Sequence, residues 1–271
     1  MLIAHEAPVS ILENIQKVTD YDYALVHLFE THPEYYKFFK HAIAAGREVL
    51  LDNSIFELGT AFDASKFAMY VKDLKPTFYV VPDVLEDAAA TIESFINFNT
   101  AYNSSNVLPG LKIGVVQGRT YEELVECYTF MSNHADYIAI SFDYSLYQMI
   151  GRKYGNSEPH RARLQRQSSG RQTLIDMLKR DGIWNYNKPH HLLGASLASE
   201  FAKYKGDLSI RSCDTSNPVM AGLYNQRYVK GIGLGHKFAT KLVDLIDTPI
   251  RDIDLNDIFF NINCFRSICN D

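Results

Sequence analysis

The chain has 271 residues, of which 46% are apolar, and its 27 basic and 32 acidic side chains give a formal net charge of −5. This length and apolar content allow one large core and require no second domain. The negative net charge excludes a protein that attracts nucleic acid through an overall positive field. Any nucleic acid that binds must therefore contact a local basic patch.

The hydropathy and the cysteines indicate the compartment. No apolar run approaches the roughly 18 to 20 residues that span a bilayer, and the first six residues are too few and too polar for a signal peptide. The four cysteines, Cys127, Cys213, Cys264 and Cys269, show no disulfide framework, which fits a reducing environment. We therefore expect a soluble, cytoplasmic protein with no membrane partner.

Apolar runs alternate with amphipathic segments along the chain. Strands are predicted at Tyr23–Leu28, Glu48–Asp52, Phe78–Pro82, Lys112–Val116, Tyr137–Phe142, His191–Gly194 and Leu208–Cys213. Helices are predicted at Pro33–Ala45, Asp63–Leu74, Asp87–Tyr102, Tyr121–Met131, Gln172–Arg180, Ala198–Lys205 and Pro218–Gln226. Asp63 is expected to cap its helix, and Asn103–Pro109 to form an exit loop.

This order predicts the fold class. Mostly continuous apolar strands that alternate with helices are typical of a parallel sheet covered on both faces. With an eighth unit around Tyr228–Leu234, the pattern indicates an α/β protein, a single-domain (β/α)8 TIM-like barrel over residues 1–271. An open doubly wound sheet is the alternative. Polar residues at the strand ends favour the barrel, whose active sites form there.

Four of these strand ends carry side chains suited to chemistry on a base. Asp52, Asp83, Gln117 and Asp214 each follow an apolar run, and we expect them to converge on one pocket. Two carboxylates can supply one nucleophile and one acid/base. An ionised aspartate offers only acceptors and a glutamine offers both a donor and an acceptor, which together match the edge of a guanine-like base.

A basic insertion interrupts the regular order at about residues 151–171. It holds a single acid, Glu158, against His160 and six cations, Arg152, Lys153, Arg161, Arg163, Arg166 and Arg171. It follows the fifth strand, so it should emerge on the same rim as the strand-end acids. We interpret it as an arm that contacts nucleic-acid phosphates, the alternative being a solvated loop or the first turns of a helix.

Five short motifs follow one another along the chain: Leu51–Phe56, Val81–Asp83, Gly114–Gly118, His191–Gly194 and Cys213–Asp214. In this order they resemble the tRNA-guanine transglycosylase superfamily, most closely its compact relatives that place 7-deazaguanines in DNA. The resemblance implies that Asp214 is the nucleophile at C1′ of the target nucleotide and Asp52 the acid/base. It implies a base-binding set of Phe56, Asp83, Gln117, Gly118, Leu193 and Gly194.

Within that set, the resemblance makes Phe56 stack on one face of the base and Leu193 close the other. Asp83 and Gln117 would read the guanine edge. The family's Asp-Ser-Gly-Gly-Phe-Gln reads Asp52-Asn53-Ser54-Ile55-Phe56-Glu57 here, without its glycines. On the fifth strand, Ile140–Asp143 replaces the small residues expected to meet the 7-substituent.

The resemblance also implies the partners. The co-substrate would be a free 7-deazaguanine base such as preQ0 or preQ1, with no other cofactor. The sequence lacks the zinc motif of the tRNA enzymes, which is Cys-x-Cys-x-x-Cys with a later histidine. We interpret Cys264 and Cys269 as free thiols. Because no extra RNA-binding domain fits after Gln226, we expect DNA as the polymer, with tRNA as the alternative.

Three other classes of protein remain open. Gly231–Gly235 near the eighth unit suggests a phosphosugar-binding barrel. A metal-dependent hydrolase would need histidines at strand ends, but His190 and His191 are adjacent and cannot both face inward along a strand. A non-catalytic nucleic-acid-binding barrel would keep the basic arm but would not need two carboxylates facing each other.

Overall fold

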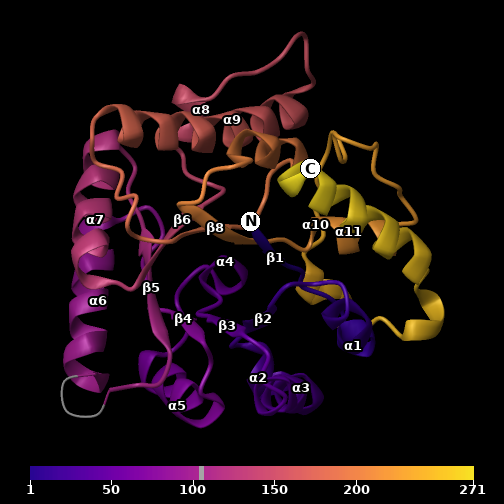
Figure 1. Ribbon diagram of the computed structural model, residues 1–271, viewed down its shortest axis with the longest axis horizontal. Helices are drawn as coiled ribbons and strands as arrows, with labels where there is room; N and C mark the ends of the chain where they lie inside the picture. Colours follow the sequence, from indigo (N-terminus) through magenta and orange to yellow (C-terminus); the bar gives the residue numbers. More distant parts are fainter. Residues whose placement is uncertain (104–106) are drawn as a thin grey trace. The chain divides into compact units, whose positions relative to one another are not determined.

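A computed structural model describes residues 1–103 and 107–271. Its strands are β1 (Leu2–Ala4), β2 (Asp22–Leu25), β3 (Val49–Asp52), β4 (Phe78–Val80), β5 (Leu111–Val116), β6 (Tyr137–Ser141), β7 (His190–Leu193) and β8 (Ile210–Asp214). They form one eight-stranded sheet in the order β1-β8-β7-β6-β5-β4-β3-β2 (Figure 1). With helices between the strands, this is a (β/α)8 TIM-like barrel, so the predicted fold class is confirmed.

Helices follow most strands. The α-helices are α1 (Leu12–Gln16), α2 (Leu28–Thr31), α3 (Pro33–Ala44), α4 (Ile55–Leu58), α5 (Ala64–Leu74), α6 (Ala88–Tyr102), α7 (Tyr121–His134), α8 (Tyr147–Ile150), α9 (Pro159–Arg180), α10 (Asn217–Leu223) and α11 (Leu255–Asn270). The 3-10 helices are η1 (Val9–Ile11), η2 (Ala198–Tyr204), η3 (Leu242–Leu245) and η4 (Ile250–Asp252). None of the helices in the described ranges is long and apolar enough to cross a membrane.

Local capping explains where several helices begin. The side chain of Asp63 accepts a hydrogen bond from the Lys66 backbone, which confirms the predicted cap of α5, and Asp87 caps α6 in the same way. Thr120 and Glu123 form a reciprocal capping box at the start of α7. Of the predicted exit loop Asn103–Pro109, residues 104–106 lie outside the described part of the chain.

The eighth strand is not where the sequence analysis put it. Tyr228–Leu234 contains only an isolated bridge between Val229 and Gly233, around Gly231 in a left-handed conformation. The missing strand is β1 at the N-terminus, which pairs with β8 in the register Leu2↔Ser212 and Ala4↔Asp214. Its three residues are too short a run for an apolar pattern to show.

The predicted basic insertion is largely helical. Helix α9 begins at Pro159 and not near Gln172, because proline fits the first turn and buried residues such as Ala162 and Leu164 continue the apolar face towards the N-terminus. The high polar content of the segment concealed this face. Arg161, Arg163 and Arg166 therefore lie on a helix, and only Arg152 and Lys153 precede it.

The chain groups into two compact units. Unit 1 comprises residues 1–20, 141–186 and 190–271, and unit 2 comprises residues 21–140 and 187–189. In unit 1 the ring of Phe201 packs on that of Phe265, with centroids 5.1 Å apart. In unit 2 Phe67 packs on Phe98 at 6.0 Å, and α6 and α7 lie side by side against β5 (Figure 1). Each unit thus has its own aromatic core.

Candidate functional site

In unit 1, Asp214 ends β8 as a buried carboxylate that is held from two sides. Its Oδ1 lies 2.9 Å from Nε2 of His191 and accepts a hydrogen bond from the Gly194 backbone N–H at 3.1 Å. The His191 Nδ1 lies 2.9 Å from the Ser212 hydroxyl. A carboxylate only accepts, so Nε2 of His191 carries the proton at this contact. Both contacts use Oδ1, which leaves the lone pairs of Oδ2 for a substrate atom.

Gly194 is required here by its conformation and by its neighbour. Its φ is +61°, and a Cβ at this position would lie 2.6 Å from Cδ1 of Phe142. A larger residue would therefore displace the N–H that binds Asp214. Leu193, which precedes it at the end of β7, is half-buried.

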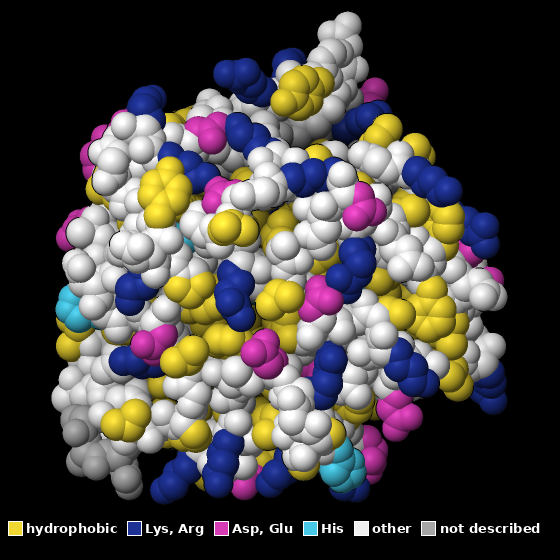
Figure 2. Space-filling model, in the orientation of Figure 1, with side chains coloured by type: hydrophobic (Ala, Val, Ile, Leu, Met, Phe, Trp, Pro, Cys, Tyr) yellow, Lys and Arg dark blue, Asp and Glu magenta, His cyan; other side chains and the backbone are white. Residues whose placement is uncertain are grey.

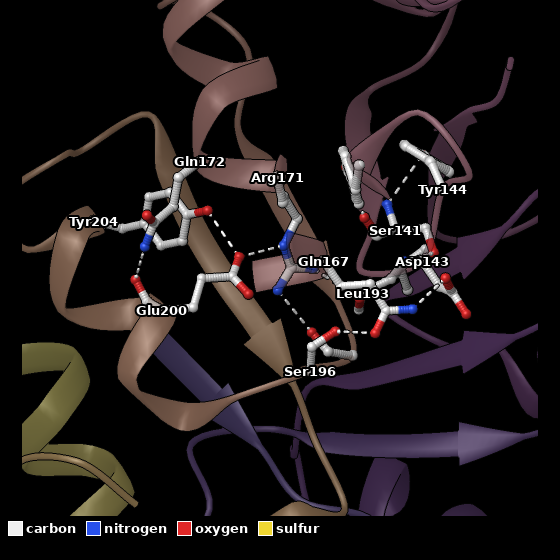
Figure 3. Close-up of polar contacts among 12 residues, drawn as sticks. Ser141, Asp143, Tyr144, Gln167, Arg171, Gln172, Leu193, Ser196, Glu200 and Tyr204 are labelled. Atoms are coloured by element: carbon white, nitrogen blue, oxygen red, sulfur yellow. Dashed lines mark hydrogen bonds and ion pairs between the residues drawn. The ribbon is translucent and has the colours of Figure 1, made fainter. Parts of the chain in front are cut away.

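The backbone that follows β7 is fixed by Arg171 (Figure 3). The Nη1 and Nη2 groups of Arg171 donate to the carbonyls of Leu193 and Gly194, each at 2.9 Å. Its Nε donates to Oε1 of Glu200 at 2.5 Å, and the Tyr204 hydroxyl donates to the same oxygen at 2.8 Å. Burial raises the pKa of Glu200, and the Arg171 guanidinium opposes that rise.

The prediction that Arg171 binds nucleic acid is wrong. Its side chain is fully buried and paired with Glu200, so no phosphate can reach it. It instead holds the Gly194 backbone, and through it the carboxylate of Asp214.

A second polar network ties α9 to the loop after β6 (Figure 3). Gln167 donates through Nε2 to Oδ1 of Asp143 and accepts from the Ser196 hydroxyl at 3.2 Å. Arg163 lies 3.5 Å from the other oxygen of Asp143. Helix α9 thus supports the segments after both β6 and β7.

Lys237 is a residue of this region that the sequence analysis did not single out. Its Nζ lies 3.8 Å from the centroid of the Phe142 ring, a cation–π contact. Burial lowers the pKa of Lys237 to about 8, and the carboxylates of Asp143, Glu6 and Asp214 oppose that shift. The nearby Gly231–Gly235 stretch was the only signal for this segment.

In unit 2, Asp83 is a buried acceptor held by two amides. Its Oδ1 accepts from Nδ2 of Asn53 and its Oδ2 from Nε2 of Gln117, both at 2.7 Å. Burial raises the pKa of Asp83, with these two hydrogen bonds opposing the rise. The Gln117 Oε1 in turn accepts from the Glu86 backbone N–H at 2.9 Å. Gln117 therefore orients Asp83, and both ends of its amide are bonded within the protein, so its predicted contact with the guanine edge stays a prediction. Asn53 is a partner that the sequence analysis missed.

Asp52 lies at the end of β3, where a tight turn leads into α4. Its Oδ1 accepts from the Ser54 backbone N–H at 2.6 Å, and Asn53 Oδ1 accepts from that of Ile55 at 3.0 Å. Ser54 has a φ of +62°, a left-handed conformation that glycine adopts more readily. The turn thus forms without a glycine, and it places Phe56 on α4 with 43% of its surface exposed.

Gly118 packs on the helix that follows β5. A Cβ at this position would lie 2.9 Å from both the Cβ of Glu123 and the backbone N of Leu124. The close approach of the chain to α7 accounts for this glycine, and its role beside a base stays a prediction.

The predicted site residues fall into two sets. Unit 1 brings Asp214 together with Leu193 and Gly194 and adds His191, whereas unit 2 brings Asp83 together with Gln117 and adds Asn53. Unit 2 also carries Asp52, Phe56 and Gly118. That the two sets meet in one pocket stays a prediction.

The remaining basic residues of the insertion are accessible. Arg152, Lys153, Arg161 and Arg163 are exposed and Arg166 is half-buried. Figure 2 shows Lys and Arg side chains gathered over the α8 and α9 region. Within residues 1–103 and 107–271, no group of three or more His, Cys, Asp or Glu side chains is arranged to hold a metal ion.

No protein-family model matches the chain, and no curated protein matches it either.

Proposed function

We propose that the chain is a transglycosylase, a pentosyltransferase that exchanges a guanine in DNA for a free 7-deazaguanine base through a covalent aspartyl-nucleotide intermediate. The observation that carries the proposal is the carboxylate of Asp214, held through one oxygen by His191 and Gly194 at the end of a barrel strand. A buried carboxylate with one oxygen fixed and the other unused by these contacts suits a nucleophile. The order of the five motifs, which resembles guanine transglycosylases, supports this chemistry.

The reaction follows double displacement. The target nucleotide is extruded from its stack, and Oδ2 of Asp214 attacks C1′ while the bond from C1′ to N9 of guanine breaks. The leaving guanine takes a proton at its imidazole ring from Asp52. The incoming 7-deazaguanine then gives its N9 proton to Asp52 and attacks C1′, which releases Asp214 with retention of configuration.

Recognition of the base falls to Asp83. Guanine presents two donors, N1–H and the N2 amino group, and the two oxygens of a carboxylate can accept from both. Asn53 and Gln117 hold this carboxylate in a single orientation before a base arrives. Adenine lacks the N1–H and would present the lone pair of its N1 to a carboxylate oxygen, so it should bind poorly.

DNA is proposed as the polymer because the sequence lacks the zinc motif of the tRNA enzymes, whereas the exposed cations around α9 suit the phosphates of either polymer. A tRNA substrate is the alternative. A non-catalytic nucleic-acid-binding barrel would have the same cations, but it gives no reason for a histidine and a backbone N–H to fix one oxygen of Asp214.

Incorporation of labelled 7-deazaguanine tests the proposal, with duplex DNA, single-stranded DNA and tRNA assayed side by side. Wild-type protein should label DNA, and Asp214→Asn should label no polymer. Asp176→Asn is a matched control, because Asp176 is an exposed carboxylate of α9 paired with Lys203. Labelling of tRNA alone would reverse the choice of polymer, and labelling of none would leave the binding barrel as the better account.

A further inference from the structure

A short turn directly after Asp83 exposes two adjacent apolar side chains. Val84 and Leu85 are 39% and 40% exposed, in a segment that leads from β4 to α6. We call residues 84–86 the rim turn. Single exposed apolar residues are ordinary, but here two neighbours follow directly on the proposed base-reading carboxylate.

The backbone of the rim turn is rigidly held. Val84 N–H donates to the Thr91 hydroxyl at 3.0 Å, and that hydroxyl donates to the Val84 carbonyl at 3.0 Å. The Asp87 N–H donates to the same carbonyl at 3.3 Å. Glu86 has a left-handed φ of +54°, a conformation that costs free energy in a residue other than glycine and persists where contacts enforce it.

One of those contacts comes from the proposed base site. The side chain of Gln117 donates to Asp83 through Nε2 and accepts the Glu86 N–H through Oε1, at 2.7 and 2.9 Å. The rim turn and the base-reading carboxylate are therefore fixed to each other through one amide group. Val84 and Leu85 therefore keep a fixed position beside the residue that the proposed base would contact.

We propose that Val84 and Leu85 form a wedge that enters the base stack beside the extruded guanine and fills the gap that it leaves. This inference rests on the proposed function and names the surface that its substrate meets. Proteins that unstack bases commonly insert one or two apolar side chains at the step that opens. A preformed turn suits this task, because little ordering entropy is lost when it inserts.

The size of the surface favours a base stack over a protein partner. Stable protein interfaces bury about 800 Å² on each side, far more than two side chains supply. An exposed cation, Arg119, follows Gln117 by two residues and offers a charge for the backbone phosphates of the same strand.

The test compares one variant on three DNA substrates. Val84→Ser/Leu85→Ser should lower kcat/KM for exchange in fully paired duplex by at least about tenfold, because unstacking a base costs a few kcal/mol and the wedge no longer offsets it. The loss should shrink to less than about threefold when the target guanine faces an abasic site or lies in a single strand, since little unpairing remains to be done.

Two matched variants isolate the wedge. Met69→Ser removes a 70% exposed apolar side chain from α5 in the same unit and should change none of the three rates. Val84→Ile/Leu85→Phe keeps an apolar wedge and should retain exchange in paired duplex. Binding of free guanine should be unchanged in all three variants.

Two results overturn the wedge while the proposed function stands. One is an equal loss on all three substrates, which makes the rim turn a support of the base pocket, and the other is an undiminished rate on paired duplex. Wild-type protein that exchanges no base in any polymer defeats the proposed function and the wedge together.

Discussion

Removing the guanidinium of Arg171 should be among the most damaging substitutions in unit 1. In Arg171→Met, Glu200 stays buried with its charge uncompensated, and the Leu193 and Gly194 carbonyls lose their donors. Breaking one side of a buried ion pair typically costs about 3–5 kcal/mol, and at about 2–4 °C per kcal/mol the melting temperature should fall by roughly 6–20 °C. Arg171→Met/Glu200→Leu should recover part of this loss, because it leaves no buried charge.

Urea unfolding followed by circular dichroism measures the free energy of unfolding, and thermal unfolding measures the melting temperature. Arg163→Met is the matched control. Arg163 is 61% exposed and lies 3.5 Å from Asp143, so its removal should cost only about 0–1 kcal/mol. At a temperature where it is folded, Arg171→Met should keep the wild-type salt dependence of DNA binding. A stability within about 1 kcal/mol of wild type, or a lower salt slope in a fully stable variant, would refute the assignment of Arg171 as a buried clamp.

Three further predictions concern the proposed reaction. His191→Phe removes the donor to Oδ1 of Asp214, and a hydrogen bond to a charged group contributes about 1.5–3 kcal/mol. The kcat for exchange should therefore fall about 10- to 100-fold with little change in KM. An unchanged kcat would make His191 structural. Burial raises the pKa of Asp83, so on acidification its carboxylate should protonate, and guanine binding measured by calorimetry should weaken, at a higher pH than for an ordinary aspartate. Asp83→Asn should abolish this pH dependence, and a wild-type affinity that stays constant on acidification would contradict it. The accessible cations to replace by alanine are Arg152, Lys153, Arg161, Arg163 and Arg166. Their loss should reduce the slope of log binding constant against log salt concentration for duplex DNA by about 0.9 for each phosphate that is no longer neutralised. An unchanged slope would show that the basic insertion lies outside the interface.

The strand ends were readable from the sequence because each one changes abruptly from apolar to polar. Asp52 and Asp214 end β3 and β8, Asp83 follows β4 closely and Gln117 follows β5 directly, all as the patterns predicted. The cap at Asp63 was readable for a similar reason, since it depends on residues three positions apart.

Interactions between distant segments were not readable. Arg171 resembles its basic neighbours in the sequence, and only its ion pair with Glu200, 29 residues away, shows that it is buried. His191 is adjacent to His190 in the sequence, where only one of the two can face inward, and its pairing with Asp214 depends on the register of β7 against β8. Strand β1 was missed because its stability comes from pairing with β8 and not from its own three residues.

Trapping the covalent intermediate tests the central claim most directly. With an oligonucleotide and no incoming deazapurine, wild-type protein should form an adduct that resists denaturation, and peptide mass spectrometry should place the nucleotide on Asp214. Adding a 7-deazaguanine base before denaturation should discharge the adduct into modified DNA, and Asp214→Asn should bind the oligonucleotide without forming it. An adduct on Asp52, or exchange by Asp214→Asn at the wild-type rate, would contradict the account.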